Sequence, residues 1–112
     1  IRELNKIIKA KDYDIWLTYL TRDYKEKHSN SEVLKEFSEQ PTLKKYGVEL
    51  ETLRDYFIYV VSPSRANARL DDLIFVNDNH VKAIMEVNDH RVILYLLEKV
   101  NGKWKITTRD EN

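Results

Sequence analysis

The residues that could do chemistry are spread along the chain rather than gathered at the spacing of a known motif. His28, His80 and His90 form neither His-x-His nor His-Glu-x-x-His, so their spacing does not indicate a metal site. Ser62 and Ser64 flank a proline and lack the glycine-framed elbow of a serine hydrolase. From these residues we predict no metal site and no cofactor, and we name no catalytic residue.

The composition excludes several classes of site. The chain has 112 residues, with 19 Lys and Arg against 19 Asp and Glu, two Gly and no Cys. Without Cys there is no thiol nucleophile, disulfide or Cys-based zinc site, and two glycines do not make a phosphate-binding loop. A net charge of zero lacks the basic footprint of a nucleic-acid binder. The length predicts a single domain over residues 1–112.

Aromatic residues are the most suggestive side chains that remain. They make up 11% of the chain, and 7 of them are Tyr. Tyr combines apolar area with a hydroxyl that needs a partner, so such residues either line a pocket or interface or fill an amphipathic core, and core positions are the more common. The longest apolar run, residues 56–61, is far shorter than the about 20 residues that span a bilayer. No transmembrane segment is predicted.

The elements that must position these side chains begin with helices. Apolar residues at helical spacing over residues 2–20 predict either one long helix or two short ones that meet near Lys11 and Asp12. Thr21 then has the side chain of an N-cap and predicts a short helical turn that ends at Tyr24.

Two further helices are predicted before the strands. Residues 29–32, Ser-Asn-Ser-Glu, have the form of a capping box and begin a helix that ends at Pro41. Residues 42–46 predict one further turn. Residues 49–61 combine strand-favouring residue types with helical spacing of the apolar ones, and we predict a helix that Pro63 ends.

The second half alternates apolar and polar residues, which is typical of strands. Short turns rich in Asn, Asp and Gly separate the runs and make neighbouring strands antiparallel. Residues 92–97 are apolar on both faces and predict a central strand covered on both sides. Helices followed by strands predict an α+β fold. The four predicted strands are roughly residues 68–76, 80–87, 90–100 and 103–108.

Several short motifs resemble the NTF2-like superfamily, a cone-shaped α+β fold. Residues 101–106, Asn-Gly-Lys-Trp-Lys-Ile, resemble its closing hairpin, and residues 10–17 resemble its opening helix. Residues 69–73 followed by 81–83 resemble its first long hairpin, and residues 55–69 resemble small uncharacterised bacterial lipoproteins. The resemblance spans nearly the whole chain and implies N-terminal helices packed on a curved four-stranded antiparallel meander. This chain departs from many members in having helix where they carry extra strands.

The resemblance implies several functions, because NTF2-like folds host isomerases, dehydratases, transport adaptors and binding modules. Our leading hypothesis is a non-enzymatic module that binds a small apolar or amphipathic ligand in the cone, or a protein partner. It rests on the aromatic faces of the helices and on the apolar third strand. The candidate pocket residues are Tyr13, Trp16, Tyr19, Tyr56, Tyr59, Tyr95 and Trp104.

Two alternatives stay open. An isomerase or dehydratase would need a cavity Asp or His within reach of a Tyr, and Asp14 or the pair Asp55 and Tyr56 are the candidates. For Asp55 a solvated helix face is the favoured position. A dimeric interaction domain would instead use an exposed apolar patch on the sheet, with Ile93 and Leu97 beside Tyr95.

The compartment depends on what precedes the sequence. The chain starts at Ile1 rather than Met, so we expect either a trimmed sequence or a processed product, with the targeting information in the missing start. If that start were a lipoprotein signal, we would expect a lipid-anchored protein outside the cytoplasm. A plain Met start would return the protein to the cytoplasm.

Overall fold

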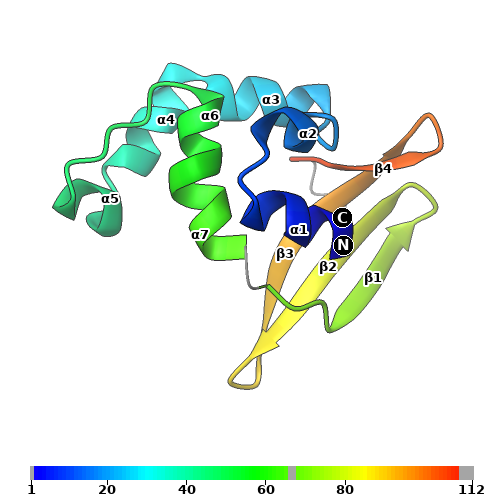
Figure 1. Ribbon diagram of the computed structural model, residues 1–112. Coiled ribbons are helices and arrows are strands. Elements are labelled where there is room, and N and C mark those ends of the chain that lie inside the picture. The colour runs from blue at the N-terminus through cyan, green and yellow to red at the C-terminus, as the bar shows by residue number, and fades with distance from the viewer. Residues whose placement is uncertain (1, 66–67, 109–112) are drawn as a thin grey trace.

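The computed structural model describes residues 2–65 and 68–108 and has the α+β architecture that the sequence predicts. Helices occupy the first part of the chain, and a four-stranded sheet with strand order β1-β2-β3-β4 follows (Figure 1). All three strand pairs are antiparallel, so the sheet is an open meander. The prediction of helices packed on a curved antiparallel meander is therefore confirmed.

The chain begins with two short helices rather than one long one. Helix α1 covers Arg2–Lys9 and α2 covers Tyr13–Leu17. Lys11, between them, has a left-handed backbone with a φ of 57°. The Asp12 carboxylate caps α2 by accepting the Ile15 N–H at 3.3 Å, because the first N–H groups of a helix have no partner within it.

The next two helices lie end to end along the sequence. Helix α3 covers Arg22–Ser29, which is longer than the predicted single turn, and Thr21 is its N-cap as predicted. Helix α4 covers Ser31–Ser38, but its N-cap is Asn30 rather than Ser29. The Asn30 side chain accepts the backbone N–H groups of Glu32 and Val33 at 2.9 and 3.3 Å. An N-cap accepts from the residues two and three positions later, so a cap at Ser29 would begin the helix one residue earlier.

Pro41 and Pro63 both lie within helices, although each was predicted to end one. Helix α4 ends before Pro41, which then begins α5, Pro41–Lys45, at the position where a missing N–H costs nothing. Pro63 was predicted to end a helix, but it lies inside α7, Ser62–Arg65. It lies directly after the π-helical turn over residues 57–61, inside a helical stretch that continues to Arg65.

Three helical segments run without a break from Leu53 to Arg65. Helix α6, Leu53–Tyr56, passes into a π-helical turn η1, Phe57–Val61, and then into α7. The helix begins with a true capping box, in which Thr52 and Asp55 satisfy one another's backbone N–H groups. We call this continuous stretch the long helix, residues 53–65.

The second and third strands match their predicted bounds, whereas the first begins four residues later than predicted and the fourth ends two residues earlier. The strands are β1 Asp72–Asn77, β2 His80–Val87, β3 His90–Val100 and β4 Lys103–Ile106. The turn before β3 has positive φ at Asn88 and Asp89, and the turn before β4 has positive φ at Asn101 and Gly102. Paired left-handed residues of this kind make the tight hairpin turns that the sequence predicts.

A bulge in β3 places two consecutive side chains in the interior. Ala83 pairs with Tyr95, whereas the next residue, Ile84, pairs with Ile93, so Leu94 is the extra residue. Leu94 and Tyr95 are both buried. The prediction that residues 92–97 are covered on both faces is wrong for their first part, because Val92 and Ile93 are 40% and 45% exposed.

The core lies between the helices and one side of the sheet. Trp16 and Phe57 are fully buried at its centre, with Ile8, Leu20 and Leu34. The segment between α2 and α3 joins the sheet directly. The Thr21 N–H donates to the Ile106 carbonyl at 2.9 Å, and the Ile106 N–H donates to the Tyr19 carbonyl at 2.6 Å. The N-terminal helices are thereby attached to β4.

Candidate functional site

A run of packed aromatic rings leads from the core toward α4. The Trp16 and Phe57 rings lie 4.5 Å apart, and Trp16 meets the Tyr24 ring edge to face at 5.9 Å. From Tyr24 the run continues through His28 and ends at Phe37. Offset and edge-to-face packing of this kind stabilises aromatic clusters beyond the apolar area they bury.

His28 is held between two tyrosine rings. It is buried, with its ring centre 4.1 Å from that of Tyr24 and 4.6 Å from that of Tyr56. Its Nδ1 lies 3.1 Å from the Tyr24 carbonyl, and because a carbonyl only accepts, Nδ1 carries the proton. Burial lowers the pKa of His28 below its usual value, with the Tyr24 hydrogen bond opposing the shift and the Lys27 charge adding to it.

The rings of Tyr24, His28, Phe37 and Tyr56 form one wall of a cavity of about 500 Å³. The other walls come from the long helix, from β3 and from the residues that follow β4. This volume falls within the range of small-molecule sites. The polar and charged residues that line the cavity are Tyr24, Lys27, His28, Tyr56, Ser64, Arg65, Tyr95, Thr107 and Thr108.

The tyrosines that line this cavity are Tyr24, Tyr56 and Tyr95, and the arginine that lines it is Arg65. Tyr24 and Tyr56 lie close enough for each phenol to influence the pKa of the other. The Tyr95 hydroxyl is buried and has no hydrogen-bond partner among the described residues. The Arg65 guanidinium is close enough for its charge to act on all three phenols.

The phenols are neutral at physiological pH. Burial raises the pKa of Tyr24, Tyr56 and Tyr95 and outweighs the opposing charge of Arg65. For Tyr95 the pKa rises to about 12. The cavity therefore offers hydroxyl donors, a neutral imidazole and a cation, set among apolar side chains from the long helix and β3.

The structure brings together only some of the aromatic residues proposed as a pocket. Tyr56 and Tyr95 line the cavity. Tyr13 and Trp16 lie in the adjoining core, where the Trp16 indole N–H is buried without a partner in the described parts of the chain. Tyr59 is 47% exposed. Tyr19 and Trp104 do not line this cavity but line two other hollows, of about 110 Å³ and about 500 Å³.

The carboxylates considered for catalysis lie away from the cavity. Asp14 is exposed in α2, and the Asp55 carboxylate accepts the backbone N–H groups of Glu51 and Thr52 at 2.9 and 3.1 Å. Within residues 2–65 and 68–108, no three His, Asp or Glu side chains gather where they could hold a metal ion. His90 is exposed, and His80 meets the Asn77 side chain in the β1–β2 turn.

The cavity residues that the sequence analysis did not propose as pocket residues include Tyr24, His28 and Arg65. Tyr24 and His28 lie one turn apart on α3, so helical spacing could have grouped them as one face. Arg65 ends the long helix, where a basic residue is common for reasons unrelated to ligands. No local signal links it to the other two.

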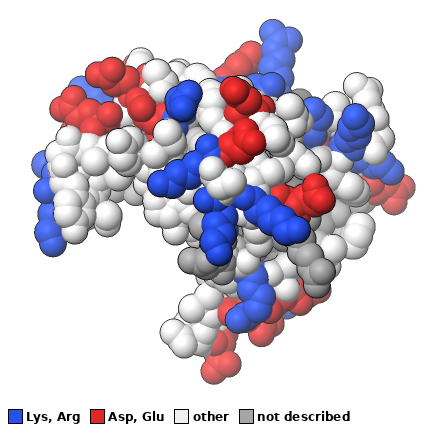
Figure 2. All heavy atoms as spheres, in the orientation of Figure 1, with Lys and Arg blue, Asp and Glu red and all other residues white. Residues whose placement is uncertain are grey.

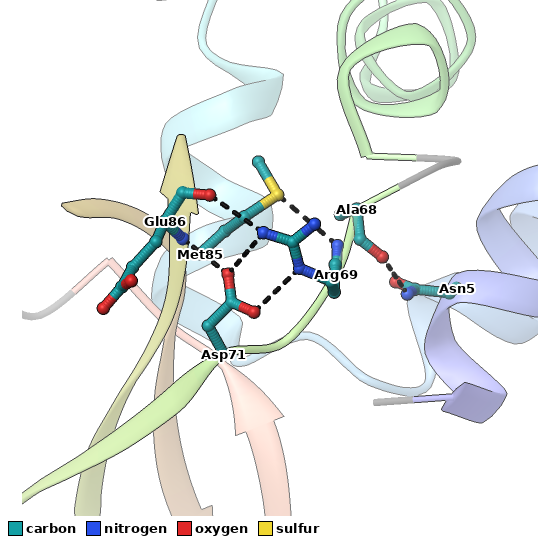
Figure 3. Close-up of polar contacts among 6 residues, drawn as sticks. All are labelled: Asn5, Ala68, Arg69, Asp71, Met85 and Glu86. Atoms are coloured by element: carbon teal, nitrogen blue, oxygen red, sulfur yellow. Dashed lines mark hydrogen bonds and ion pairs between the residues drawn. The ribbon is translucent and has the colours of Figure 1, made fainter. Parts of the chain in front are cut away.

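A second polar cluster, shown in Figure 3, is structural. Arg69 makes a two-pronged ion pair with Asp71 at 2.7 and 3.0 Å and donates to the Glu86 carbonyl at 3.0 Å. The Asp71 carboxylate also accepts the Glu86 N–H at 2.6 Å. Its hydrogen bonds, first of all to Arg69, lower the pKa of Asp71. The cluster fastens the segment before β1 to β2 and lies away from the cavity.

Charge is mixed over the rest of the surface. Figure 2 shows Lys and Arg interspersed with Asp and Glu on the face in view. The surface also carries exposed ion pairs, such as Arg22 with Glu26 at 3.1 Å and Lys44 with Glu39 at 3.6 Å. Pairs of this kind contribute little to stability. Because the two signs alternate, the face in view has no extended patch of one charge.

A comparison with known proteins finds a bacterial relative. The chain is 38% identical over 106 residues to an uncharacterised lipoprotein of Treponema pallidum (strain Nichols). The match covers 95% of this chain but 56% of the relative, so the chain spans about half the relative's length. This homology supports the resemblance to bacterial lipoproteins seen at residues 55–69.

Other comparisons add no neighbour. No protein-family profile and no solved structure matches the sequence. Among the described residues, none of the helices has the length and apolar character needed to cross a membrane.

Proposed function

We propose that this chain is a non-enzymatic NTF2-like module that binds a small apolar or amphipathic molecule in the cavity between the long helix and β3. The observation that carries the proposal is the buried hydroxyl of Tyr95, a residue that lines a cavity of about 500 Å³. This hydroxyl has no hydrogen-bond partner among the described residues. A buried hydroxyl without a partner costs free energy, and a bound molecule with a polar group would satisfy it.

The proposal is tested by blocking the cavity. Val60 lines it, and Val60→Trp would fill part of its volume. Val87→Trp makes the same change at an exposed residue of β2 that does not line the cavity, and it serves as the matched control. The probe is N-phenyl-1-naphthylamine, an uncharged dye whose emission increases in apolar surroundings.

We expect the dye to bind the wild-type chain and Val87→Trp with equal affinity and to bind Val60→Trp at least tenfold more weakly. Circular dichroism establishes that both variants are folded. If Val60→Trp is unfolded, Leu96→Trp replaces it, because Leu96 also lines the cavity and is only partly buried. Equal binding by a folded, blocked variant, or no binding by the wild type, would contradict the proposal.

An isomerase or dehydratase is a second candidate, favoured by one observation. His28 lines the cavity as a neutral base between two tyrosines, which is the kind of group such an enzyme needs. Asp14 and Asp55 do not line the cavity and so could not serve such an enzyme as its base. Turnover of an enolisable ketone that is lost in His28→Gln would favour the enzyme, whereas binding without turnover favours the module.

We further propose that the natural protein is lipid-anchored outside the cytoplasm, as the name of its Treponema relative suggests for that protein. Labelling of the protein in its own cells with an alkyne-bearing fatty acid tests this. Covalent incorporation is expected, and a protein that stays unlabelled would contradict it.

A further inference from the structure

We propose that the molecule bound in the cavity carries an anionic group, a carboxylate or a phosphate monoester, that Arg65 holds while the apolar part packs against the aromatic wall. This inference rests on the proposed function and adds the chemical class of its ligand.

The first argument is the uncompensated charge of the cavity. Lys27 and Arg65 are the cationic residues that line it, and none of the described residues lining it is Asp or Glu. Among the described residues, three other arginines have carboxylate partners, namely Arg22 with Glu26, Arg69 with Asp71 and Arg91 with Asp72. A partly buried cation facing a cavity without a carboxylate favours an anion there.

The second argument is the unused donors of Arg65. Its Nε donates to the Leu94 carbonyl at 3.2 Å and its Nη1 donates to the Ser64 carbonyl at 3.4 Å. A guanidinium has five N–H donors, so the others have no partner among the described residues. The Nε bond holds the group against β3 while donors remain for the two oxygens of a carboxylate or phosphate.

The third argument is the state of the phenols around it. Tyr95 lines the cavity and is 5% exposed, and its buried hydroxyl has no partner among the described residues. Because burial holds its pKa at about 12, it is a donor rather than a competing anion. An anionic oxygen bound by Arg65 would accept this hydroxyl hydrogen bond, which removes the cost of leaving the hydroxyl unpaired.

The remaining lining favours an amphipathic anion over a free inorganic one. Phe37, Val60, Val61, Leu94 and Leu96 make much of the rest of the wall. A small inorganic ion would leave this apolar surface uncovered, whereas an alkyl or aryl group would bury it. We therefore expect a molecule with one charged end and one apolar end.

The experiment compares three probes with the same eight-carbon tail, namely octanoate, octyl phosphate and uncharged octanol. Affinities for the folded chain are measured by calorimetry at pH 7.5 and low salt. We expect at least one anionic probe to bind about 10- to 100-fold more tightly than octanol, since hydrogen bonds to a charged group are worth this much. Which anion binds more tightly identifies the head group as carboxylate or phosphate.

Two variants assign the preference to residues. Arg65→Gln should reduce binding of the preferred anion to the level of octanol and leave octanol binding unchanged. The matched control is Arg54→Gln, an exposed arginine of the long helix that does not line the cavity, and it should keep the preference. If Arg65→Gln is unfolded, Tyr95→Phe gives a second test, because it removes the unpartnered hydroxyl and should weaken anion binding severalfold.

The outcomes separate this inference from the proposed function. Equal binding of octanol and both anions would overturn the role of Arg65 while leaving the cavity as a ligand site. An anion preference that survives in folded Arg65→Gln would also overturn it. Failure of all three probes to bind would count against the proposed function itself, and with it this inference.

Discussion

The Arg65 guanidinium donates through Nε to the carbonyl of Leu94 at 3.2 Å, joining the end of the long helix to the bulge of β3. Leu94 is the extra residue of that bulge, so the contact lies where the strand changes register. The bulge also turns Tyr95 into the interior beside Leu94. One irregularity in the sheet thus positions both the cation and the unpartnered hydroxyl of the candidate site.

The first prediction concerns the core beneath the cavity. Trp16 and Phe57 are fully buried and do not line the cavity, and their rings lie 4.5 Å apart. Phe57→Ala should lower the free energy of unfolding by about 3–5 kcal/mol, because it removes buried apolar area and leaves a void. Urea unfolding followed by circular dichroism measures this. Tyr46→Ala, at a residue 72% exposed, is the control and should change stability by less than about 0.5 kcal/mol.

The second prediction concerns the pH dependence of stability. Burial places the pKa of folded His28 below the unfolded value of 6.5, so the unfolded chain takes up this proton first as the pH falls. The stabilisation that comes from keeping His28 neutral is fully present above pH 6.5. It is lost as the pH falls below 6.5 toward the pKa of the folded state. Lys27 is the charged neighbour that acts in the same direction.

The measurement compares urea unfolding at pH 7.5 and 5.5. The wild-type chain should lose more stability over this interval than His28→Phe, which carries no titrating ring at this position. His90→Gln, at an exposed position, should behave like the wild type. A wild-type chain and His28→Phe with the same pH dependence would show that His28 is not held neutral by burial.

The third prediction distinguishes two adjacent capping candidates. Asn30→Ala should destabilise the fold by about 1 kcal/mol, because its side chain accepts two N–H groups of α4. Ser29→Ala should have almost no effect, since Ser29 is the exposed last residue of α3. Thermal unfolding of both variants checks this. Equal destabilisation by the two would contradict the assignment of Asn30 as the cap.

The fourth prediction tests the dimeric alternative. Tyr95 is buried, so the patch proposed from Ile93, Tyr95 and Leu97 is not available as a whole. The edge strand β1 instead exposes Phe75 by 66%. If the chain dimerises through this edge, light scattering should give twice the 13.4 kDa mass for the wild type and one copy for Phe75→Glu. A monomeric wild type at millimolar concentration would exclude this dimer.

The sheet was the most predictable part of the fold. Residues 80–87 and 90–100 match β2 and β3, because Asn and Asp in left-handed conformation make tight turns that leave strong local signals. The exposure of Val92 and Ile93 was not predictable, since it depends on how distant segments pack against the sheet. The bulge at Leu94 has no sequence signal either.

The helix boundaries show where local rules compete. Ser29 and Asn30 are both good N-caps, and the choice between them depends on where α3 ends. Pro63 is a helix breaker by its chemistry, yet the long helix continues past it to Arg65. In both places the prediction had the right residue types and the wrong position.

The candidate site was half predictable. Tyr56 and Tyr95 were named for their residue type, and whether they bind a ligand stays a prediction. Tyr24, His28 and Arg65 join them only because α3, the long helix and β3 pack together. Contacts between segments so far apart in the sequence leave no periodic pattern.

The measurement that tests the central claim most directly is the location of a bound ligand by nuclear Overhauser effects. The folded chain is isotope-labelled and saturated with unlabelled octanoate, and contacts between the alkyl protons and aromatic rings are recorded. The account predicts contacts to Tyr56, His28 and Tyr95 in the cavity. Contacts confined to exposed rings such as Tyr59 and Trp104 would contradict it.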